Sequence, residues 1–187
     1  MRVYYDTEFI ESGKSLQFVS LGAQDENGRI FYAESNEFDS SLAVPWVKNN
    51  VLNQLGTIQS SSNAEIASNF ENWINETRHD RLELWSYFGA WDLCVLFSLY
   101  GGFLNIPSGW PQNNFDIVQE SIRLGIRIPA QKTKRHRADV DAVWTRESHI
   151  FLMEYEESLY RQNRFRVNGR TVQINGGEVE RVDILPR

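Results

Sequence analysis

The sequence has a single cysteine, Cys94, and lacks an apolar run long enough to cross a membrane. The longest such run, around Leu93 to Leu99, is far shorter than the roughly 20 residues that a spanning helix needs. One cysteine cannot form an internal disulfide, and we expect it to be a buried core thiol in a reducing compartment. Because the chain starts with a charged strand and shows no signal peptide, the sequence predicts a cytoplasmic protein.

Basic residues are also few, with 19 Lys and Arg against 25 Asp and Glu and a net charge of −6. This balance argues against a protein that coats nucleic acid through bulk charge. The segment 123–137 nevertheless carries several basic residues and no acid. They are Arg123, Arg127, Lys132, Lys134, Arg135 and Arg137. Either a solvated loop or a rim that guides phosphates would explain this basic run.

The 187 residues, 41% of them hydrophobic, suit one domain with a sizeable core. β-branched and aromatic runs predict strands, and apolar residues at helical spacing predict helices. The predicted strands are 2–5, 15–23, 29–35 and 82–87, followed near the C-terminus by 170–174 and 178–184. The predicted helices are 64–77, 90–100, a short one capped by Asp116 and ending near Leu124, and 138–162.

This order of elements predicts an α/β fold in which a central mixed sheet is flanked by helices. Turn signals at Asn168-Gly169 and Asn175-Gly176 predict a small C-terminal β appendage. We therefore expect residues 1–163 to form the main domain and residues 164–187 to form a β-hairpin extension of the same domain.

Asp6 and Glu8 follow the first predicted strand and lie two residues apart. Side chains at this spacing share one face of a strand, so the two carboxylates would project side by side. Neighbouring anions repel each other unless a cation joins them, and hard cations such as Mg²⁺ prefer carboxylate oxygen. Taken alone, the pair is better explained by a strand that runs into a solvated turn. Whether the pair indicates a metal site depends on whether further carboxylates from elsewhere in the chain lie beside it.

Asp92 lies in the first turn of a predicted helix, among strongly apolar neighbours. The helix dipole alone would explain an acid there, but an Asp in such company usually has a specific partner. His136 precedes the longest predicted helix, which opens with Asp139 and Asp141. A loop histidine that folds back over the helix would reach Asp141, and we expect Asp139 to keep a capping role.

Together, Asp6-x-Glu8, Asp92 and His136 five positions before Asp141 resemble the pattern of the DEDDh exonucleases. These enzymes belong to the RNase H-like superfamily and include proofreading exonucleases, oligoribonuclease and RNase T. The opening Tyr-Asp-Thr-Glu-Phe-Ile-Glu-x-Gly and the later Tyr-x-Gly-Ala-Trp-Asp are similar to the mycobacterial-type 3′–5′ exoribonuclease branch. The likeness covers roughly residues 1–160 and implies an RNase H-like fold.

The resemblance implies a metal-dependent 3′–5′ exoribonuclease that releases nucleoside 5′-monophosphates from RNA. Two Mg²⁺ or Mn²⁺ ions would be held by Asp6, Glu8, Asp92 and Asp141, with Asp6 as the bridging ligand. His136 would act as the general base on the attacking water. By analogy with RNase T and oligoribonuclease, the chain is expected to form a homodimer.

In related enzymes, side chains after the first motif cap the last nucleotide, which points to Phe9 and Ile10. Phe88 could stack a base, and Lys134 and Arg135 would contact phosphates. Core packing explains Phe9 and Phe88 equally well, and we favour it for Trp91.

The chain departs from the family pattern at Tyr87-Phe88, where many members carry His-Asn. This departure concerns substrate contacts rather than metal binding. A DNA exonuclease of proofreading or repair type remains open, because recognition of the 2′-hydroxyl depends on contacts that no motif reveals. A degenerate nucleotide- or RNA-binding module is a third possibility, against which the complete set of acids argues. An RNase H-type endonuclease is less expected, because the His136–Asp141 spacing marks the exonuclease branch.

Overall fold

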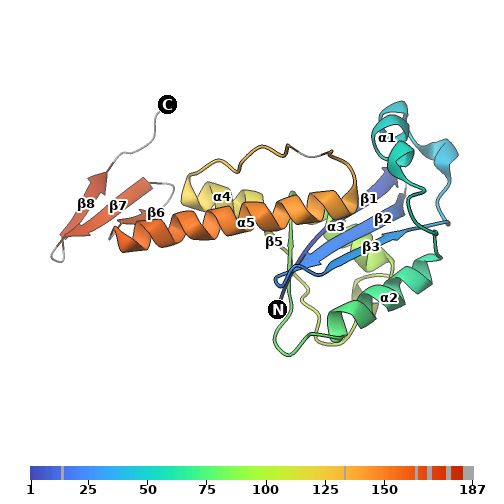
Figure 1. Cartoon of the computed structure of the whole chain (residues 1–187), viewed down its shortest axis with the longest axis horizontal. Helices are drawn as coiled ribbons and strands as arrows, with labels where there is room; N and C mark the ends of the chain where they lie inside the picture. The colour runs from blue at the N-terminus through green and yellow to red at the C-terminus, as the bar shows by residue number, and fades with distance from the viewer. Residues whose placement is uncertain (14, 133, 163, 168–169, 176–177, 183–187) are drawn as a thin grey trace.

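The computed structural model describes residues 1–187 apart from 14, 133, 163, 168–169, 176–177 and 183–187, with side chains described as far as residue 162 (Figure 1). The strands are β1 Arg2–Glu11, β2 Leu16–Asp25, β3 Ile30–Glu34, β4 Glu83–Ser86, β5 Phe115–Asp116, β6 Arg164–Val167, β7 Arg170–Asn175 and β8 Glu178–Val182. The α-helices are α1 Pro45–Asn50, α2 Asn63–Asn75, α3 Ala90–Ser98, α4 Ile117–Leu124 and α5 Ala138–Arg161. Short 3₁₀ turns are η1 Ser40–Leu42, η2 Leu52–Gln54 and η3 Phe103–Asn105.

Five strands form one mixed sheet in the order β3-β2-β1-β4-β5. The central strand, β1, pairs antiparallel with β2 and parallel with β4, and β4 pairs parallel with β5. The predicted α/β fold with a mixed sheet flanked by helices is therefore confirmed. Since β1, β4 and β5 are parallel, their carboxyl ends meet at one edge, where α/β proteins commonly bind ligands.

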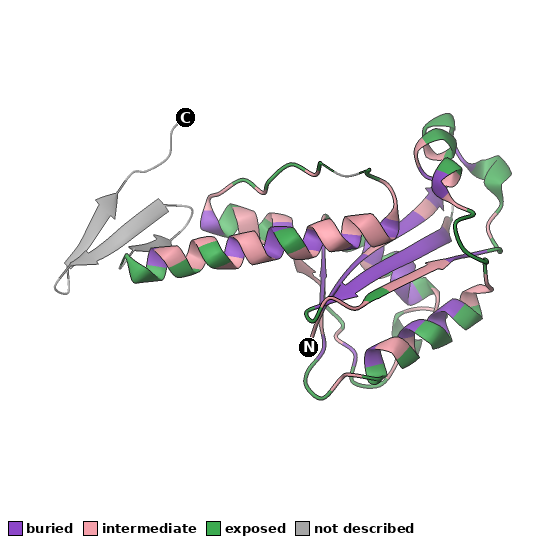
Figure 2. Cartoon of the chain, in the orientation of Figure 1, coloured by how far each residue is buried: buried purple, intermediate pink, exposed green. Residues whose placement is uncertain are grey.

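Alternate residues of β1 pack into two separate cores, one on each face of the sheet. Val3 and Tyr5 lie in a core with α2 and α3, whereas Tyr4 lies in a second core with α4 and α5. Buried residues accordingly line both β1 and β2 (Figure 2). The even-numbered side chains of β1 near its start thus face α5, and the odd-numbered ones face α3.

The first strand is longer than the sequence predicts. It continues through Asp6, Thr7 and Glu8 as far as Glu11, with a register shift between Glu8 and Phe9. Pairing with β2 overrides the weak strand propensity of these polar residues. The carboxylates thus lie within a central strand, which removes the explanation that a solvated turn follows Tyr5.

Two predictions on α3 are wrong. Cys94 is exposed rather than buried, and Trp91 is 55% exposed rather than packed in the core. The inner face of α3 is formed by Asp92, Val95 and Leu96, which are all buried. Because successive residues turn by about 100°, positions 91 and 94 fall on the outer face.

The longest helix, α5, crosses the sheet and extends beyond it towards β6–β8 (Figure 1). Those strands form a separate antiparallel sheet in the order β6-β7-β8, so a third strand precedes the two predicted ones. The division into a main domain and an extension stays a prediction. No helix among the described residues is both long and apolar enough to span a bilayer.

Candidate functional site

The first turn of α5 lies directly against the sheet at Gly22, the partner of Asp6 in the β1–β2 ladder. A Cβ atom at position 22 would overlap the carbonyl carbon of Ala138 and the backbone nitrogen of Asp139. Glycine is therefore required for this close approach of helix and strand. The approach brings Asp141, one turn into α5, near Asp6 and Glu8.

Glu8, His136 and Asp141 converge. One side-chain oxygen or nitrogen atom from each lies within 4.8 Å of the others. The His136 loop folds back over the helix, and its backbone N–H donates a hydrogen bond to Oδ2 of Asp141 at 2.8 Å. The side-chain amide of Gln131 donates to the other oxygen of Asp141. The sequence-based expectation that His136 reaches Asp141 from the loop therefore agrees with this geometry.

Residues from the segment after β3 hold the His136 loop in place. The Trp46 ring meets the His136 ring edge-on, with 4.8 Å between centroids. The buried amide nitrogen of Gln54 lies 2.8 Å from the carbonyl oxygens of both Arg135 and His136. His136 itself has a φ of 62°, in the left-handed region that non-glycine residues seldom adopt. The loop conformation is thus fixed by tertiary contacts.

Asp92 enters the site from the first turn of α3. Its Oδ1 accepts hydrogen bonds from the backbone N–H of Thr7 at 2.9 Å and from the Thr7 hydroxyl at 2.7 Å. Thr7 points to the α3 face of β1, whereas Asp6 and Glu8 point to the α5 face. This one residue therefore ties the acid on α3 to the strand that carries the other two.

The four carboxylates lie close enough to repel one another electrostatically. Burial, followed by the charges of Asp92, Glu8 and Asp141, raises the pKa of Asp6 well above its usual range. Burial, followed by the charges of Asp141 and Asp92, raises the pKa of Glu8 to about 8. Four acids from three distant segments thus share one partly buried region, which is unfavourable without added positive charge.

The other two acids are held by hydrogen bonds. Burial raises the pKa of Asp92 to about 6, although the hydrogen bonds from Thr7 act in the opposite direction. Burial also raises the pKa of Asp141, against hydrogen bonds from Gln131 and His136. A set of carboxylate oxygens with a nearby imidazole fits hard divalent cations such as Mg²⁺ or Mn²⁺.

Burial lowers the pKa of His136, and the positive charge of Arg135 acts in the same direction, while Asp141 opposes both. A histidine with a lowered pKa is neutral at pH 7 and can accept a proton. The imidazole lies beside the carboxylate oxygens of Glu8 and Asp141, as measured above. The arrangement therefore places a proton acceptor next to a candidate cation site.

The residues predicted to contact the substrate differ in how exposed their side chains are. Ile10 is fully buried in a core with Val19, so its side chain is not exposed to a bound nucleotide, and its substrate role stays a prediction. Phe9 is partly buried and packs against the main core. Phe88 is 61% exposed beside Asp92, and Lys134 and Arg135 are exposed near His136.

A polar pocket of about 400 Å³ is lined by the His136 loop, the end of α1 and the η2 turn. Its lining is Asn49, Asn50, Asn53, Gln54, Lys134, Arg135 and His136. No motif pointed to the amide residues, because asparagine and glutamine are ordinary in surface loops. Only the tertiary structure brings them next to the predicted histidine.

The sequence is similar to known exoribonucleases. Two 3′–5′ exoribonucleases of Mycobacterium tuberculosis, from strains CDC 1551 and H37Rv, are each 36% identical to this chain over 146 residues. The match covers 76% of this chain and 87% of each relative. No family model matches the sequence.

The fold is similar to that of exonuclease I. A zinc-bound complex of Escherichia coli exonuclease I with single-stranded DNA aligns with a TM-score of 0.59 at 13% identity. Exonuclease I of Methylocaldum szegediense aligns with the same values. Each alignment covers 87% of this chain but 43% of the other, so this chain spans less than half the length of those structures.

Proposed function

The chain belongs to the DEDDh 3′–5′ exonuclease family together with the mycobacterial 3′–5′ exoribonucleases, and we propose that it is a metal-dependent exoribonuclease. It would remove nucleotides from the 3′ end of RNA and release nucleoside 5′-monophosphates. The observation that carries the proposal is the convergence of Glu8, His136 and Asp141, with Asp92 close enough to raise the pKa of both Asp6 and Glu8.

The carboxylates of Asp6, Glu8, Asp92 and Asp141 would hold two divalent cations. When bound, Mg²⁺ or Mn²⁺ would supply positive charge that offsets the repulsion between these acids and stabilises the charge developing on the phosphodiester. Thr7 orients Asp92 by two hydrogen bonds, and Gln131 orients Asp141 by one. Such outer partners fix the direction in which ligand oxygens point.

His136 would take a proton from the water that attacks the terminal phosphodiester. Its lowered pKa keeps the imidazole neutral and able to accept at pH 7. Its backbone hydrogen bond to Asp141, together with the contacts from Trp46 and Gln54, holds the ring near the acids. General base catalysis of this kind typically contributes about 10²–10⁴-fold to the rate.

The test is degradation of a 5′-labelled RNA by the purified chain in Mg²⁺ or Mn²⁺. We expect stepwise shortening from the 3′ end that stops when a chelator is added. Asp141→Asn should abolish it, whereas Asp139→Asn should not, because Asp139 pairs with Arg137 at 2.7 Å on the same helix turn. RNA that stays full-length with wild-type protein would refute the proposed activity.

DNA is the second candidate substrate, because exonuclease I structures with the same fold include complexes with single-stranded DNA and with a dT13 oligonucleotide. Matched RNA and DNA oligonucleotides of one sequence would decide between them. A larger kcat/KM for RNA is expected. The reverse preference would replace the exoribonuclease proposal with a DNA exonuclease.

The remaining parts of the proposal concern assembly and location. We expect a homodimer, by analogy with RNase T and oligoribonuclease, and we expect it to act in the cytoplasm. Sedimentation velocity measures the first, and a single species at the mass of the 21.8 kDa chain would contradict it.

A further inference from the structure

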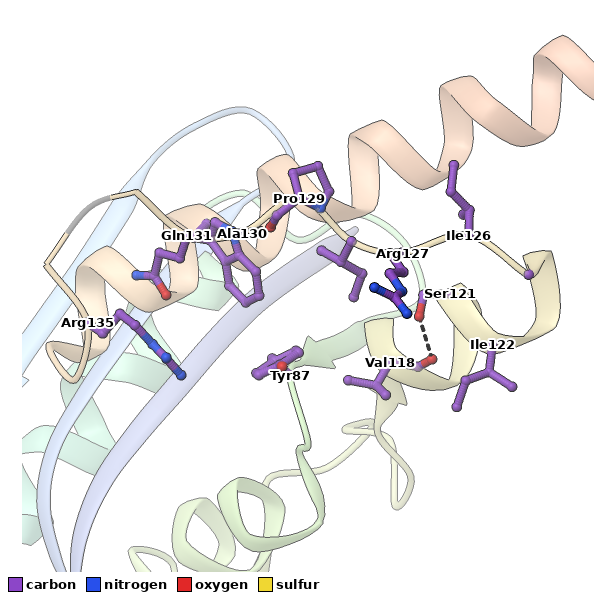
Figure 3. Close-up of a pocket in the computed structure, with 13 residues that line it drawn as sticks. Tyr87, Val118, Ser121, Ile122, Ile126, Arg127, Pro129, Ala130, Gln131 and Arg135 are labelled. Atoms are coloured by element: carbon purple, nitrogen blue, oxygen red, sulfur yellow. Dashed lines mark hydrogen bonds between the residues drawn. The ribbon is translucent and has the colours of Figure 1, made fainter. Parts of the chain in front are cut away.

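A second pocket, of about 950 Å³, lies beside the site at the carboxyl ends of β4 and β5 (Figure 3). Tyr87, directly after β4, forms one wall, and α4 with the segment 125–131 forms another. The apolar part of its lining includes Val118, Ile122, Ile126, Ile128 and Trp144. Because carboxyl ends of parallel strands are usual ligand-binding places in α/β folds, this position favours a binding role.

The apolar pocket adjoins the carboxylate cluster through shared residues. Gln131 lines it and donates a hydrogen bond to Asp141. Arg135 lines both this pocket and the smaller polar pocket that contains His136. The two pockets therefore share Arg135, with His136 lining the polar pocket and Asp141 hydrogen-bonded to Gln131 of the apolar one.

Arg127 and Arg135 both line the apolar pocket, and in the view of Figure 3 they lie on either side of Tyr87. Neither Arg127 nor Arg135 forms an ion pair with another described residue. Arg123, in the same basic run, is instead paired with acidic residues at 2.5 and 2.7 Å. A guanidinium without an acidic partner fits a phosphate oxygen, which it can bind through two N–H groups. Within the described part of the chain, Arg123 and Arg137 thus form ion pairs with acids, whereas the two pocket arginines form none.

Aromatic rings offer surfaces for bases in the same pocket. Tyr87 and Trp144 are half-buried and meet at nearly right angles, with ring centroids 4.9 Å apart. Ile122 also lines this pocket and is 69% exposed, so its apolar side chain is accessible to a bound base. The pocket thus combines aromatic and apolar walls with two positively charged arginine side chains. This combination fits a single strand of nucleic acid, whose bases stack on aromatic rings and whose backbone is anionic.

The sizes of the two pockets indicate which nucleotides of a bound nucleic-acid strand each pocket could hold. The polar pocket beside His136, about 400 Å³, lies near the lower end of the roughly 300–1,000 Å³ range of small-molecule sites. It suits the one nucleotide that an exonuclease releases in each cycle. The apolar pocket, about 950 Å³, lies near the upper end of that range and suits several connected nucleotides.

We propose that the apolar pocket binds the nucleotides of a single RNA strand that lie immediately 5′ to the cleaved bond. Arg127 and Arg135 would contact their phosphates, and Tyr87 with the apolar lining would contact their bases. This inference rests on the proposed exonuclease function, and it predicts that catalysis improves with substrate length beyond a dinucleotide.

The first test measures binding by fluorescence anisotropy, with a 5′-labelled ten-nucleotide RNA whose 3′ linkages are phosphorothioates that resist hydrolysis. Arg127→Ala should weaken binding by about tenfold or more, since a charge-assisted contact is lost. It should also reduce the slope of log affinity against log salt by about 0.7, the value for one phosphate of a single strand. Ile122→Glu, at an exposed position, should weaken binding by placing an anion in the pocket. Arg161→Ala is the matched control, an equal change of charge at the far end of α5.

The second test compares kcat/KM for the ten-nucleotide RNA and for a dinucleotide. Arg127→Ala and Ile122→Glu should lower the ratio of the two values, and Arg161→Ala should not. If wild-type protein cleaves neither RNA, the proposed function fails. If it cleaves both and neither pocket variant changes binding or the ratio, the pocket inference alone is wrong. A sedimentation coefficient altered by Ile122→Glu with RNA binding intact would mean that a second copy covers the pocket, which also overturns the inference.

Discussion

The backbone N–H of His136 donates to Oδ2 of Asp141 across 2.8 Å, so the candidate base and one candidate metal ligand are held as a unit. In this position His136 has a left-handed backbone conformation, with a φ of 62°. For a non-glycine residue this conformation is unfavourable by about 1–3 kcal/mol. The amide of Gln54 and the ring of Trp46 supply the contacts that keep the conformation. Strain of this kind persists where surrounding structure fixes it, and such places are commonly functional.

Replacing the imidazole separates its proton-accepting role from metal binding. We expect His136→Asn to lower kcat by about 10²–10⁴-fold, the usual contribution of a general base. Binding of Mn²⁺, followed by isothermal titration calorimetry, should change far less, because the carboxylates remain. His79→Asn, at an exposed histidine, is the control. Wild-type kcat in His136→Asn would remove the histidine from the mechanism.

Removing the Thr7 hydroxyl tests how Asp92 is held. Thr7→Val keeps the shape of the side chain but removes the 2.7 Å hydrogen bond to Oδ1 of Asp92. Loss of such an outer partner typically costs about 10–100-fold in metal affinity or activity. The control is Thr145→Val, because the buried Thr145 hydroxyl has no hydrogen-bond partner among the described residues. Equal Mn²⁺ affinity in both variants would contradict the role of Thr7.

Metal removal should make stability depend on pH. The pKa of Glu8 is about 8 in the folded chain, above its ordinary value of 4.5, because burial and nearby acids disfavour its ionised form. A raised carboxyl pKa contributes stability that is present below pH 4.5 and is lost as the pH rises through 8. The Tm in a chelator should therefore fall between pH 5 and 8, and Glu8→Gln should flatten that fall.

Added Mg²⁺ should reverse the fall, because cations bind the deprotonated carboxylates and so release protons. The Tm gain from Mg²⁺ should be larger at pH 8 than at pH 5, as measured by scanning fluorimetry. A gain of the same size at both values would show that Glu8 does not titrate in this range.

Adding one methyl group at Gly22 tests the spacing between sheet and helix. Gly22→Ala places a Cβ atom against the backbone of Ala138 and Asp139. Overpacking of this kind lowers the free energy of unfolding by about 1–3 kcal/mol. Activity should fall further than stability accounts for, because the shift of α5 moves Asp141. Denaturant unfolding and kcat/KM on the same preparation measure the two effects, and intact activity would contradict the argument.

The acids predicted from the sequence lie near one another in the structure, and each follows an element with a clear local signal, while their roles stay predictions. Asp6 and Glu8 follow the spacing of a strand, and Asp92 follows a buried strand and opens a helix. The spacing of His136 and Asp141 agrees with a loop that folds back on its helix. Apart from β1, which continues to Glu11, the main strands and helices are confirmed to within a few residues, because alternation and helical periodicity are local properties.

The residues that the sequence missed act across long separations. Gln54 and Trp46 reach His136 from a segment more than 80 positions earlier, and no local pattern records such a contact. Ile10 turns into a core after the register shift in β1, which sequence alternation does not reveal. Cys94 lies in a stretch that is apolar on all sides, so periodicity gives no inner face.

The close approach at Gly22 also bears on the order of folding. The first strand supplies Asp6 and Glu8 and the last helix supplies Asp141, so the cluster is incomplete in any chain in which α5 has not docked. Contacts between such distant segments form late, because the entropy of closing the long intervening loop opposes them. Cations that favour the docked state would stabilise only the finished fold, by mass action. A nascent or partly folded chain would therefore lack the complete carboxylate cluster until α5 had reached Gly22.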